Sequence, residues 1–563
     1  MTATPQSPDR PLATATESAP TGDGSRSDTD WGAFTAEGPW QLEPDSITWR
    51  AGVRPSRADI AASLPALTDP GALPPARRIV RTTRLLGTAV LAWRARKNGK
   101  DQSASRRDLA RRLRIAAEAL GPTYIKLGQV ISSGQGLFPP ELVEEFQLCR
   151  DRVPPEPFPV IRQVVEEDLG RPIDEVFESF DRRPLAAASI AQVHRATLRS
   201  GEDVVVKVQR PSVATRVHDD LRVMAWIAPH LVGRIPVAAL ANPPALVDLF
   251  AETITEELDF RLEADNMIGV AVSLVDLGQT GYVVPRPHPE LVTRRVLVME
   301  RLSGFAFDDA AGMKAAGIDT EAIIKTGMVG FLEGAMFHGI FHGDLHGGNL
   351  LVLADGRTGL LDFGIIGRLD PPERIAFLRL VVSATMNDVR GQLAALRDLG
   401  ALPADADLDL IIEELGLDRP PVDPLEVTAD ELTAELQRVV KALLGYGARM
   451  PKPLMLFVKN LVFLDGAITT LAPDLDLIAE ITSIATYFAE RHGERIAAEV
   501  GMAPGDWAID LTGVKQSFGT DVVDSGSITH REVRRRRQEI SDRLEANRRS
   551  PDRPSGRRRR RSQ

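Results

Sequence analysis

The chain has 563 residues and is long enough for more than one domain. Hydrophobic residues make up 43% of it, which supports a large core, and its formal net charge of −10 excludes a general polyanion binder. A single cysteine, Cys149, excludes a disulfide framework within the chain and suits a reducing cytoplasm.

The first segment, residues 1–45, is rich in Ser, Thr, Pro, Asp and Gly. This composition predicts disorder, although Trp31, Trp40 and the nearby Trp49 could dock on a folded body. The sequence that starts at Met1 lacks the charged start and apolar core of a signal peptide. It also contains no run of about 18 apolar residues. We therefore expect a cytoplasmic protein without a spanning helix.

Residues 46–105 are expected to be a helical extension with a basic amphipathic stretch at residues 75–98. Two interpretations fit this stretch equally. It could lie on an anionic surface at the inner face of the cell membrane, or it could pack on the folded body like an ordinary amphipathic helix. On a membrane, the contacts would come from Arg77, Arg78, Arg81, Arg84, Leu85, Leu86 and Trp93.

The rest of the chain suggests two lobes. Residues 106–170 have the apolar spacing of further helices, whereas residues 171–303 contain strand-like runs such as Val204–Val208 and Arg295–Met299. Residues 304–500 form mostly long helical patterns, and residues 501–563 form a basic tail that we expect to be mostly disordered. This order predicts an α+β, protein-kinase-like, two-lobed fold with extra N-terminal helices and a mostly helical C-lobe.

The most specific pattern is His342-Gly-Asp344, followed by Asn349 and then by Asp362-Phe-Gly364. Kinase-like enzymes use this order for phosphoryl transfer. The first Asp accepts the proton of the attacking group, and the Asn and the second Asp hold magnesium. We therefore assign Asp344 as the catalytic carboxylate, and Asn349 and Asp362 as metal ligands.

Two apolar runs, Asn349–Leu353 and Thr358–Leu361, flank an Asp-Gly turn. This arrangement predicts a β-hairpin that brings Asn349 and Asp362 to neighbouring strand ends. The competing interpretations are that His342 and His346 are turn residues or zinc ligands. The third ligand and the helical setting of a zinc site are not evident in the sequence.

Lys207 lies near the end of a buried strand, where a kinase places the lysine that contacts the α- and β-phosphates. A helix glutamate orients such a lysine. The candidates lie in the segment from Glu256 to Glu263, and spacing alone does not select between Glu257 and Glu263. Glu300 begins the expected interlobe connection and is a candidate nucleotide contact.

The position of a glycine-rich phosphate loop is occupied by Ala186-Ala187-Ala188-Ser189. Each Cβ restricts φ and limits how closely the backbone can approach a phosphate. After Asp362-Phe-Gly364 the chain reaches Pro371 and helix almost at once, without the long activation segment that docks peptides in protein kinases. This favours a small-molecule or lipid substrate, or ATP hydrolysis.

Together these residues resemble the UbiB or AarF family of atypical kinases, which includes coenzyme Q-linked members. The resemblance covers about residues 106–400. It rests on Lys126-Leu-Gly-Gln129 (the KxGQ motif), Ala186-Ala-Ala-Ser189 (the alanine-rich loop), Glu257-Leu-Asp259 (the ExD motif), His342-Gly-Asp344 with Asn349, and Asp362-Phe-Gly364.

The resemblance implies binding of ATP and Mg2+, and N-terminal helices that cover the active site. It implies that Lys126, Gln129 and the ExD acids line the nucleotide pocket, and that Lys207 pairs with an acidic residue of the ExD helix. Glu263 is a further candidate in that region. It also implies support of isoprenoid quinone or other isoprenoid lipid metabolism, by ATPase activity or as a kinase that does not act on general proteins. The chain departs from the family at Gly347, where Pro is usual, and in its polar C-terminus.

Two other functions compete with this one. A small-molecule phosphotransferase of the aminoglycoside or choline kinase kind has a similar catalytic loop, but the Lys126–Gln129 motif and the alanine loop separate it from this chain. A scaffold that only binds nucleotide would not need Asp344, Asn349 and Asp362 together. The arginine-rich tail lacks interleaved aromatic residues, so nucleic acid is not an expected partner.

Overall fold

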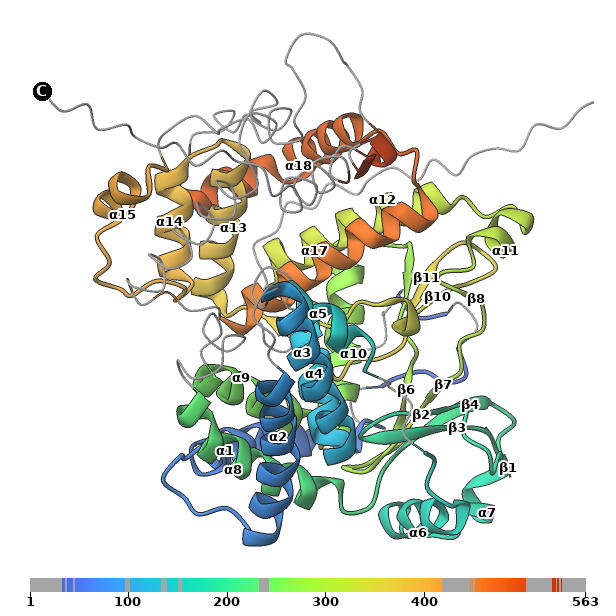
Figure 1. The fold of residues 1–563 in the computed structure, drawn as a ribbon. Coiled ribbons are helices and arrows are strands. Elements are labelled where there is room, and N and C mark those ends of the chain that lie inside the picture. The colour runs from blue at the N-terminus through green and yellow to red at the C-terminus, as the bar shows by residue number, and fades with distance from the viewer. Residues whose placement is uncertain are drawn as a thin grey trace, which may run out of the picture.

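The computed structural model describes residues 33–35, 38–43, 46–96, 102–132, 139–149, 154–231, 243–417, 446, 448, 451–502, 529–532, 534–535 and 538. Trp31 and most of the arginine-rich tail lie outside these residues. Within the described part, a strand-rich lobe and a helical lobe are flanked by N-terminal helices (Figure 1).

The small lobe is built on an antiparallel sheet with the strand order β1-β3-β4-β7-β6, and β2 pairs with β3. Alternate valines of β4 are fully buried, which explains why this segment forms a central strand. The strands are β1 (Phe177–Phe180), β2 (Ala186–Ala187), β3 (Ala191–Leu198), β4 (Asp203–Gln209), β6 (Pro287–Val292) and β7 (Val296–Glu300).

Helices pack on both faces of this sheet. One apolar core joins α6 and α7 to β3, β4 and β7, and a second core joins α10 to the opposite face and continues into the helical lobe. Asp259 accepts a hydrogen bond from the Arg261 N–H at 3.1 Å and begins α10 as its N-cap. The helices of this lobe are α6 (Phe158–Leu169), α7 (Ile173–Val176), α8 (Val213–Leu231), α9 (Pro243–Glu256) and α10 (Phe260–Asp276).

The N-terminal helices form a third apolar core with α8 and α9. In Figure 1, the blue and cyan helices α3–α5 stand between the sheet and the helical lobe, where they cover the region between the lobes. Their bounds are α1 (Val53–Leu67), α2 (Ala76–Arg96), α3 (Gln102–Leu120), α4 (Pro122–Ser132) and α5 (Pro140–Gln147).

The remaining short strands form two smaller sheets. The predicted hairpin is present, because Leu350 pairs with Leu360 and Val352 with Thr358, and Gly356 in the turn has a φ of +86°. These strands are β5 (Tyr282–Val283), β8 (Phe305–Ala306), β9 (Ile340–His342), β10 (Leu350–Val352), β11 (Thr358–Leu360) and β12 (Ile366–Arg368).

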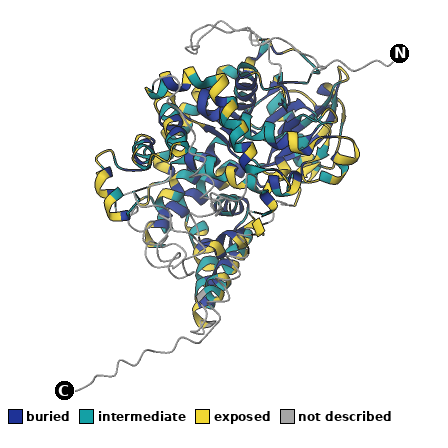
Figure 2. Cartoon of the chain, turned by 90° about the horizontal axis from the view of Figure 1, so that it is seen from above, coloured by how far each residue is buried: buried dark blue, intermediate teal, exposed yellow. Residues whose placement is uncertain are grey.

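The large lobe is helical, as its sequence predicts. Pro371 occupies the first turn of α13, where Asp370 and Glu373 form a reciprocal capping box. Figure 2 shows buried residues on the inner faces of the elements and exposed residues on their outer faces. The helices are α11 (Ala310–Ala315), α12 (Thr320–Glu333), α13 (Pro371–Thr385), α14 (Val389–Asp398), α15 (Leu408–Leu415), α17 (Lys452–Leu471) and α18 (Leu477–Val500).

The expectation of disorder up to residue 45 is wrong for residues 33–35 and 38–43. The Val284 N–H donates to the Ala33 carbonyl at 2.9 Å, and Phe34 is buried. Trp40 and Trp49 donate through Nε1 to backbone carbonyls of β6 at 3.2 and 3.1 Å, so both dock as predicted. Burial of these aromatic side chains offsets the entropy cost of ordering a polar segment.

The basic amphipathic stretch forms α2, which packs on the folded body. Leu85 and Leu86 pack against the N-terminal core, and Trp93 is 7% exposed and donates to the Ser105 carbonyl at 2.9 Å. The Arg78 guanidinium binds Asp220, with Nη2 and Oδ2 2.7 Å apart. Arg78, Leu85, Leu86 and Trp93 are therefore engaged inside the protein, whereas Arg77, Arg81 and Arg84 remain exposed.

One helix of the described chain, α17, is long and apolar enough to span a membrane, with a mean hydropathy of 1.6. From the sequence we predict no helix of this length and apolar character, and α17 corrects that prediction. In the structure α17 packs within the helical lobe, where Leu454, Leu456 and Leu471 are buried. It has the placement of a core helix.

The Arg78–Asp220 pair leads to a stability prediction. Asp220 is completely buried, so Arg78→Met leaves its carboxylate without its partner. We expect a loss of about 3–5 kcal/mol in the free energy of unfolding, measured by urea denaturation. Arg77→Met, an exposed neighbour on the same helix, should change it by about 0.5 kcal/mol or less. Equal losses in the two variants would contradict this role of the ion pair.

Candidate active site

The catalytic-loop histidine positions two carboxylate segments at once. His342 Nδ1 accepts a hydrogen bond from the Asp344 N–H at 3.1 Å, and its Nε2 bonds the Asp362 carbonyl oxygen. This pattern assigns the neutral tautomer with hydrogen on Nε2. Burial lowers the pKa of His342, which agrees with a neutral ring. His342 thus holds the Asp344 loop against the Asp362 segment, and both of its ring nitrogens are engaged in these hydrogen bonds.

The hairpin brings Asn349 and Asp362 together as predicted. The Leu361 N–H donates to the Asn349 carbonyl at 3.0 Å, so the two residues lie at neighbouring strand ends. Asn349 Nδ2 donates to the Asp344 carbonyl at 3.0 Å, which leaves Oδ1 as the amide atom able to bind a cation. Asp362 Oδ1 accepts from the Gly364 N–H at 2.9 Å. Burial opposes ionisation of Asp362, but Lys207 and Lys126 lower its pKa to about 2.

The structure selects Glu263 as the partner of Lys207. Lys207 Nζ lies 2.6 and 2.9 Å from the two Glu263 carboxylate oxygens and 3.3 Å from Asp362 Oδ2. Burial alone would lower the pKa of Lys207, but Asp362 and Glu263 raise it overall, so the ammonium is charged. Burial raises the pKa of Glu263, and the Lys207 ammonium opposes that rise.

Glu257 instead pairs with Lys126 of α4. Lys126 Nζ lies 2.9 Å from Glu257 Oε1, and both side chains are mostly buried. Burial opposes the charged form of Lys126, but Glu257, Asp344 and Asp362 raise its pKa overall. Lys126 therefore brings a positive charge from the N-terminal helices close to Asp344 and Asp362.

Gly128 allows α4 to approach α5 closely. A Cβ at this position would lie 2.5 Å from Phe146 Cδ1 and 3.2 Å from Cys149 Sγ. Only glycine therefore fits without movement of the Phe146 ring. The small residue in the Lys126–Gln129 motif is explained by packing between two helices that cover the cleft.

Lys459 lies on α17 and forms an ion pair with Asp344, a role that we did not predict from the sequence. The neighbouring Asn460 binds the His342 carbonyl through Nδ2 and accepts from the Leu345 N–H at 3.3 Å through Oδ1. Burial opposes ionisation of Asp344, but Lys459 and Lys126 hold its pKa far below the usual range. The available signal was the adjacent Lys-Asn pair inside the apolar run Leu454–Leu464.

The alanine loop is held by backbone hydrogen bonds. Ala186 and Ala187 form β2 and pair with Val193 and Gln192 of β3. The Ala188 N–H donates to the Ala191 carbonyl at 2.9 Å, and the Ala188 carbonyl accepts from Arg210 Nε at 2.9 Å. Of the four predicted loop residues, Ala188 and Ser189 line the cleft.

Two predicted site residues are placed elsewhere. Asp259 caps α10 and binds Arg261 and Ser56, with the Ser56 Oγ to Asp259 Oδ2 distance at 2.6 Å. Glu300 accepts hydrogen bonds from the Thr35 hydroxyl and from the Arg286 N–H, so its carboxylate fixes the N-terminal segment. Neither carboxylate contacts Lys207 or Lys126, and neither residue belongs to the described lining of the cleft, from which Lys207, Glu257 and Glu263 are also absent.

The cleft between the lobes has a volume of about 470 Å³. No group of three or more His, Cys, Asp or Glu side chains suited to a metal occurs among the described residues. The oxygen donors of Asn349 and Asp362 fit Mg2+, which usually takes one or two protein carboxylates and completes its sphere with phosphates and water. The described lining includes Lys126, Gln129, Ala188, Ser189, Asp344, Asn349, Asp362 and Lys459.

The two lobes, the lysine–glutamate pair and the catalytic loop define a protein-kinase-like protein. Residues 148–395 match the model of the ABC1 atypical kinase-like domain. The chain belongs to this family, which includes proteins named UbiB and aarF domain-containing kinases.

Three relatives illustrate the match. An uncharacterized Mycobacterium tuberculosis protein is 37% identical over 66% of this chain and 76% of its own length. An uncharacterized chloroplastic aarF domain-containing protein kinase of Arabidopsis thaliana is 35% identical over 65% and 73%. A probable protein kinase UbiB of Shewanella loihica is 34% identical over 65% and 67%.

Gly128 leads to a prediction about the packing of α4 against α5, the two helices that cover the cleft. Gly128→Ala forces its Cβ into the Phe146 ring, and we expect a loss of about 1–3 kcal/mol in stability. Gly466→Ala is the matched control, because this exposed glycine of α17 has nothing within 4 Å of the added Cβ. It should stabilise the helix by up to about 1 kcal/mol. Urea denaturation of both variants checks this, and a stable Gly128→Ala protein would contradict the close approach.

Proposed function

We propose that the chain is an ATP- and Mg2+-dependent atypical kinase or ATPase of the UbiB type, which supports isoprenoid quinone or other lipid metabolism. The observation that carries this proposal is the Lys207–Glu263 ion pair, in which Lys207 also contacts Asp362, a residue that lines the interlobe cleft together with Asp344. Phosphoryl transfer requires such a set of charges around the phosphates.

Each residue has a role in this proposal. Lys207, held by Glu263, contacts the α- and β-phosphates, and Asn349 and Asp362 hold the metal. Asp344 accepts the proton of the attacking hydroxyl or water. Bound Mg2+ would supply positive charge to the phosphoryl oxygens as they become more negative.

A general protein substrate does not fit the surroundings of the cleft. Residues 362–371 pass directly through β12 into α13, without room for a peptide-docking segment. Side chains of α4, α5 and α17 also line the cleft. These features support a small or lipid acceptor, or water. The Lys126–Glu257 pair favours this function over an aminoglycoside or choline kinase.

The proposed location is the cytoplasm, with peripheral contact to the inner face of the membrane. The exposed Arg77, Arg81 and Arg84 of α2 are the described residues that support this part. Val80 and Leu91 of the same helix are 65% and 66% exposed. Cationic and apolar side chains on one exposed helix suit an anionic surface.

Asp362→Asn tests the metal assignment. The change keeps the size of the side chain but removes a carboxylate, and we expect Mg2+-dependent ADP affinity and ATP turnover to fall by about 100-fold or more. Isothermal titration calorimetry and a phosphate-release assay measure the two quantities. Asp355→Asn, on the turn of the same hairpin and outside the cleft lining, is the control. Unchanged Mg2+-ADP affinity in folded Asp362→Asn would exclude the assignment.

Lys459→Met tests the residue that the sequence did not reveal. Without Lys459, Asp344 loses its direct cation partner, and we expect turnover to fall by about tenfold or more while Mg2+-ADP affinity changes far less. Lys452→Met on the same helix removes a lysine paired with Glu252 and Glu256, outside the cleft lining. An equal loss of turnover in Lys452→Met would show that the effect belongs to α17 as a whole.

A further inference from the structure

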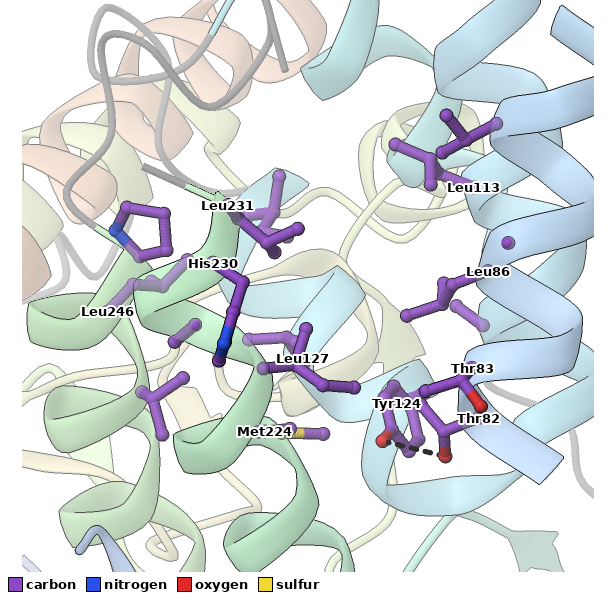
Figure 3. Close-up of a pocket in the computed structure, with 18 of the residues that line it drawn as sticks. Thr82, Thr83, Leu86, Leu113, Tyr124, Leu127, Met224, His230, Leu231 and Leu246 are labelled. Carbon is purple, nitrogen blue, oxygen red and sulfur yellow. Dashed lines mark hydrogen bonds between the residues drawn. The ribbon is translucent and has the colours of Figure 1, made fainter. Parts of the chain in front are cut away.

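A second cavity, of about 740 Å³, lies among α2, α3, α4, α8 and α9. Figure 3 shows Leu86 of α2 and Leu113 of α3 facing Met224 and Leu231 of α8 across this space, with Leu127 of α4 between them. Cavities that bind small molecules have volumes of about 300–1,000 Å³ and are mostly apolar. The size of this cavity therefore suits a ligand.

The walls of the cavity specify an apolar ligand. Polar groups near the cavity already have partners in the protein: Thr82 Oγ1 lies 3.3 Å from Tyr124 Oη, and Thr83 Oγ1 donates to the Ile79 carbonyl at 2.7 Å. Burying a further charge or several polar groups here would be costly. The apolar lining includes Leu86, Leu113, Leu127, Phe146, Met224 and Leu246.

Exposed polar residues lie at the rim. Arg94 and Thr83 of α2 and His230 of α8 line the cavity and are exposed, whereas Thr82 and Tyr124 are buried. An amphiphile could therefore place its chain inside and its polar end in water. We propose that this cavity binds a single uncharged amphiphile, such as a long-chain alcohol, and that its occupancy strengthens nucleotide binding in the cleft.

The link between the two sites is α4, which forms a wall of both. Tyr124, Leu127 and Ile131 line the apolar cavity, whereas Lys126 and Gln129 line the cleft. Residues three and four positions apart share one face of a helix, so these sets lie on two different faces of α4. An apolar molecule on one face supports the helix that presents Lys126 on the other.

Phe146 of α5 strengthens this link, because its side chain lines both spaces. Gly128 brings α4 so close to Phe146 that neither can shift without the other. A ligand that packs against Leu127 and Phe146 therefore restricts the position of Lys126. Since Lys126 pairs with Glu257 and acts on Asp344, an occupied cavity holds the cleft in one arrangement.

Binding is tested with the neutral fluorescent probe N-phenyl-1-naphthylamine and the competitor 1-decanol, on the full chain. We expect saturable probe binding that 1-decanol displaces. Leu86→Trp fills the cavity and should abolish this binding. Leu91→Trp adds the same bulk to an exposed position of α2, at 66% exposure, and should bind like the wild type.

Leu246→Trp fills the cavity from α9 and serves if Leu86→Trp fails to fold, as judged by circular dichroism and thermal melting. Equal probe binding in the wild type and in a folded cavity-filling variant would overturn the site. Absence of saturable binding to the wild type would overturn it as well.

The coupling rests on the proposed nucleotide function and is tested separately. We expect a saturating concentration of 1-decanol to tighten Mg2+-ADP binding by about fivefold or more in calorimetry, and Mg2+-ADP to tighten 1-decanol binding by the same factor. Leu91→Trp should keep this effect, and Leu86→Trp should lose it. Unchanged or weakened Mg2+-ADP affinity in the wild type would overturn the coupling. If Mg2+-ADP does not bind at all, the proposed function fails, and probe binding alone decides the cavity.

Discussion

The architecture depends on neutralising four neighbouring carboxylates, of which Glu263 is buried and Glu257, Asp344 and Asp362 are partly buried. An ionised carboxylate that is buried without a partner is strongly destabilising, because it loses its hydration. Here each lysine partner comes from a different part of the chain, so charge pairing fixes those parts relative to one another. The pairs are Lys207 of β4 with Glu263 and Asp362, Lys126 of α4 with Glu257, and Lys459 of α17 with Asp344.

These ion pairs also explain how a phosphate group and a magnesium ion would replace the contacts between lysines and carboxylates. Lys126, Lys207 and Lys459 face four carboxylates, so the described set carries a net charge of about −1 when all are ionised. Phosphate oxygens compete with carboxylates for lysines, and a magnesium ion replaces lysine charge beside an aspartate. In the proposed function, Lys207 can turn from Asp362 to phosphate while the metal compensates Asp362. The ion pairs of the cleft thus stabilise the fold and prepare the site for a nucleotide.

Sequence patterns predicted those parts of the site that depend on residues close together in the chain. The Asp-Gly turn between two apolar runs predicted the hairpin, and the hairpin places Asn349 beside the segment of Asp362. The choice between Glu257 and Glu263 was different, because the chain leaves α9 at Glu256 and enters α10 at Phe260. Because Glu257 lies in the irregular link and Glu263 lies in α10, helical periodicity does not relate the directions of their side chains. The number of residues between them therefore could not show which one pairs with Lys207.

Tertiary contacts determined the features that the sequence did not predict. Composition indicated disorder before residue 45, yet Phe34 is buried beneath the Arg286 guanidinium, 5.1 Å from the centre of its ring. Thr35 then binds Glu300 at the end of β7, which a sequence pattern cannot anticipate across such a separation. The free energy that orders this segment comes from contacts with distant residues such as Arg286 and Glu300, whereas composition reflects only the segment's own side chains.

The helix α17 shows the same limit for hydropathy. Its mean hydropathy of 1.6 measures how apolar the helix is, but not whether lipid or protein surrounds it. The polar residues settle the question: Lys459 and Asn460 are adjacent, and both contact the catalytic loop. An apolar helix that delivers one cation and one amide to buried partners must be surrounded by protein at that point. Its apolar character follows from packing between lobe helices, and the side chains of Lys459 and Asn460 connect that core to the cleft.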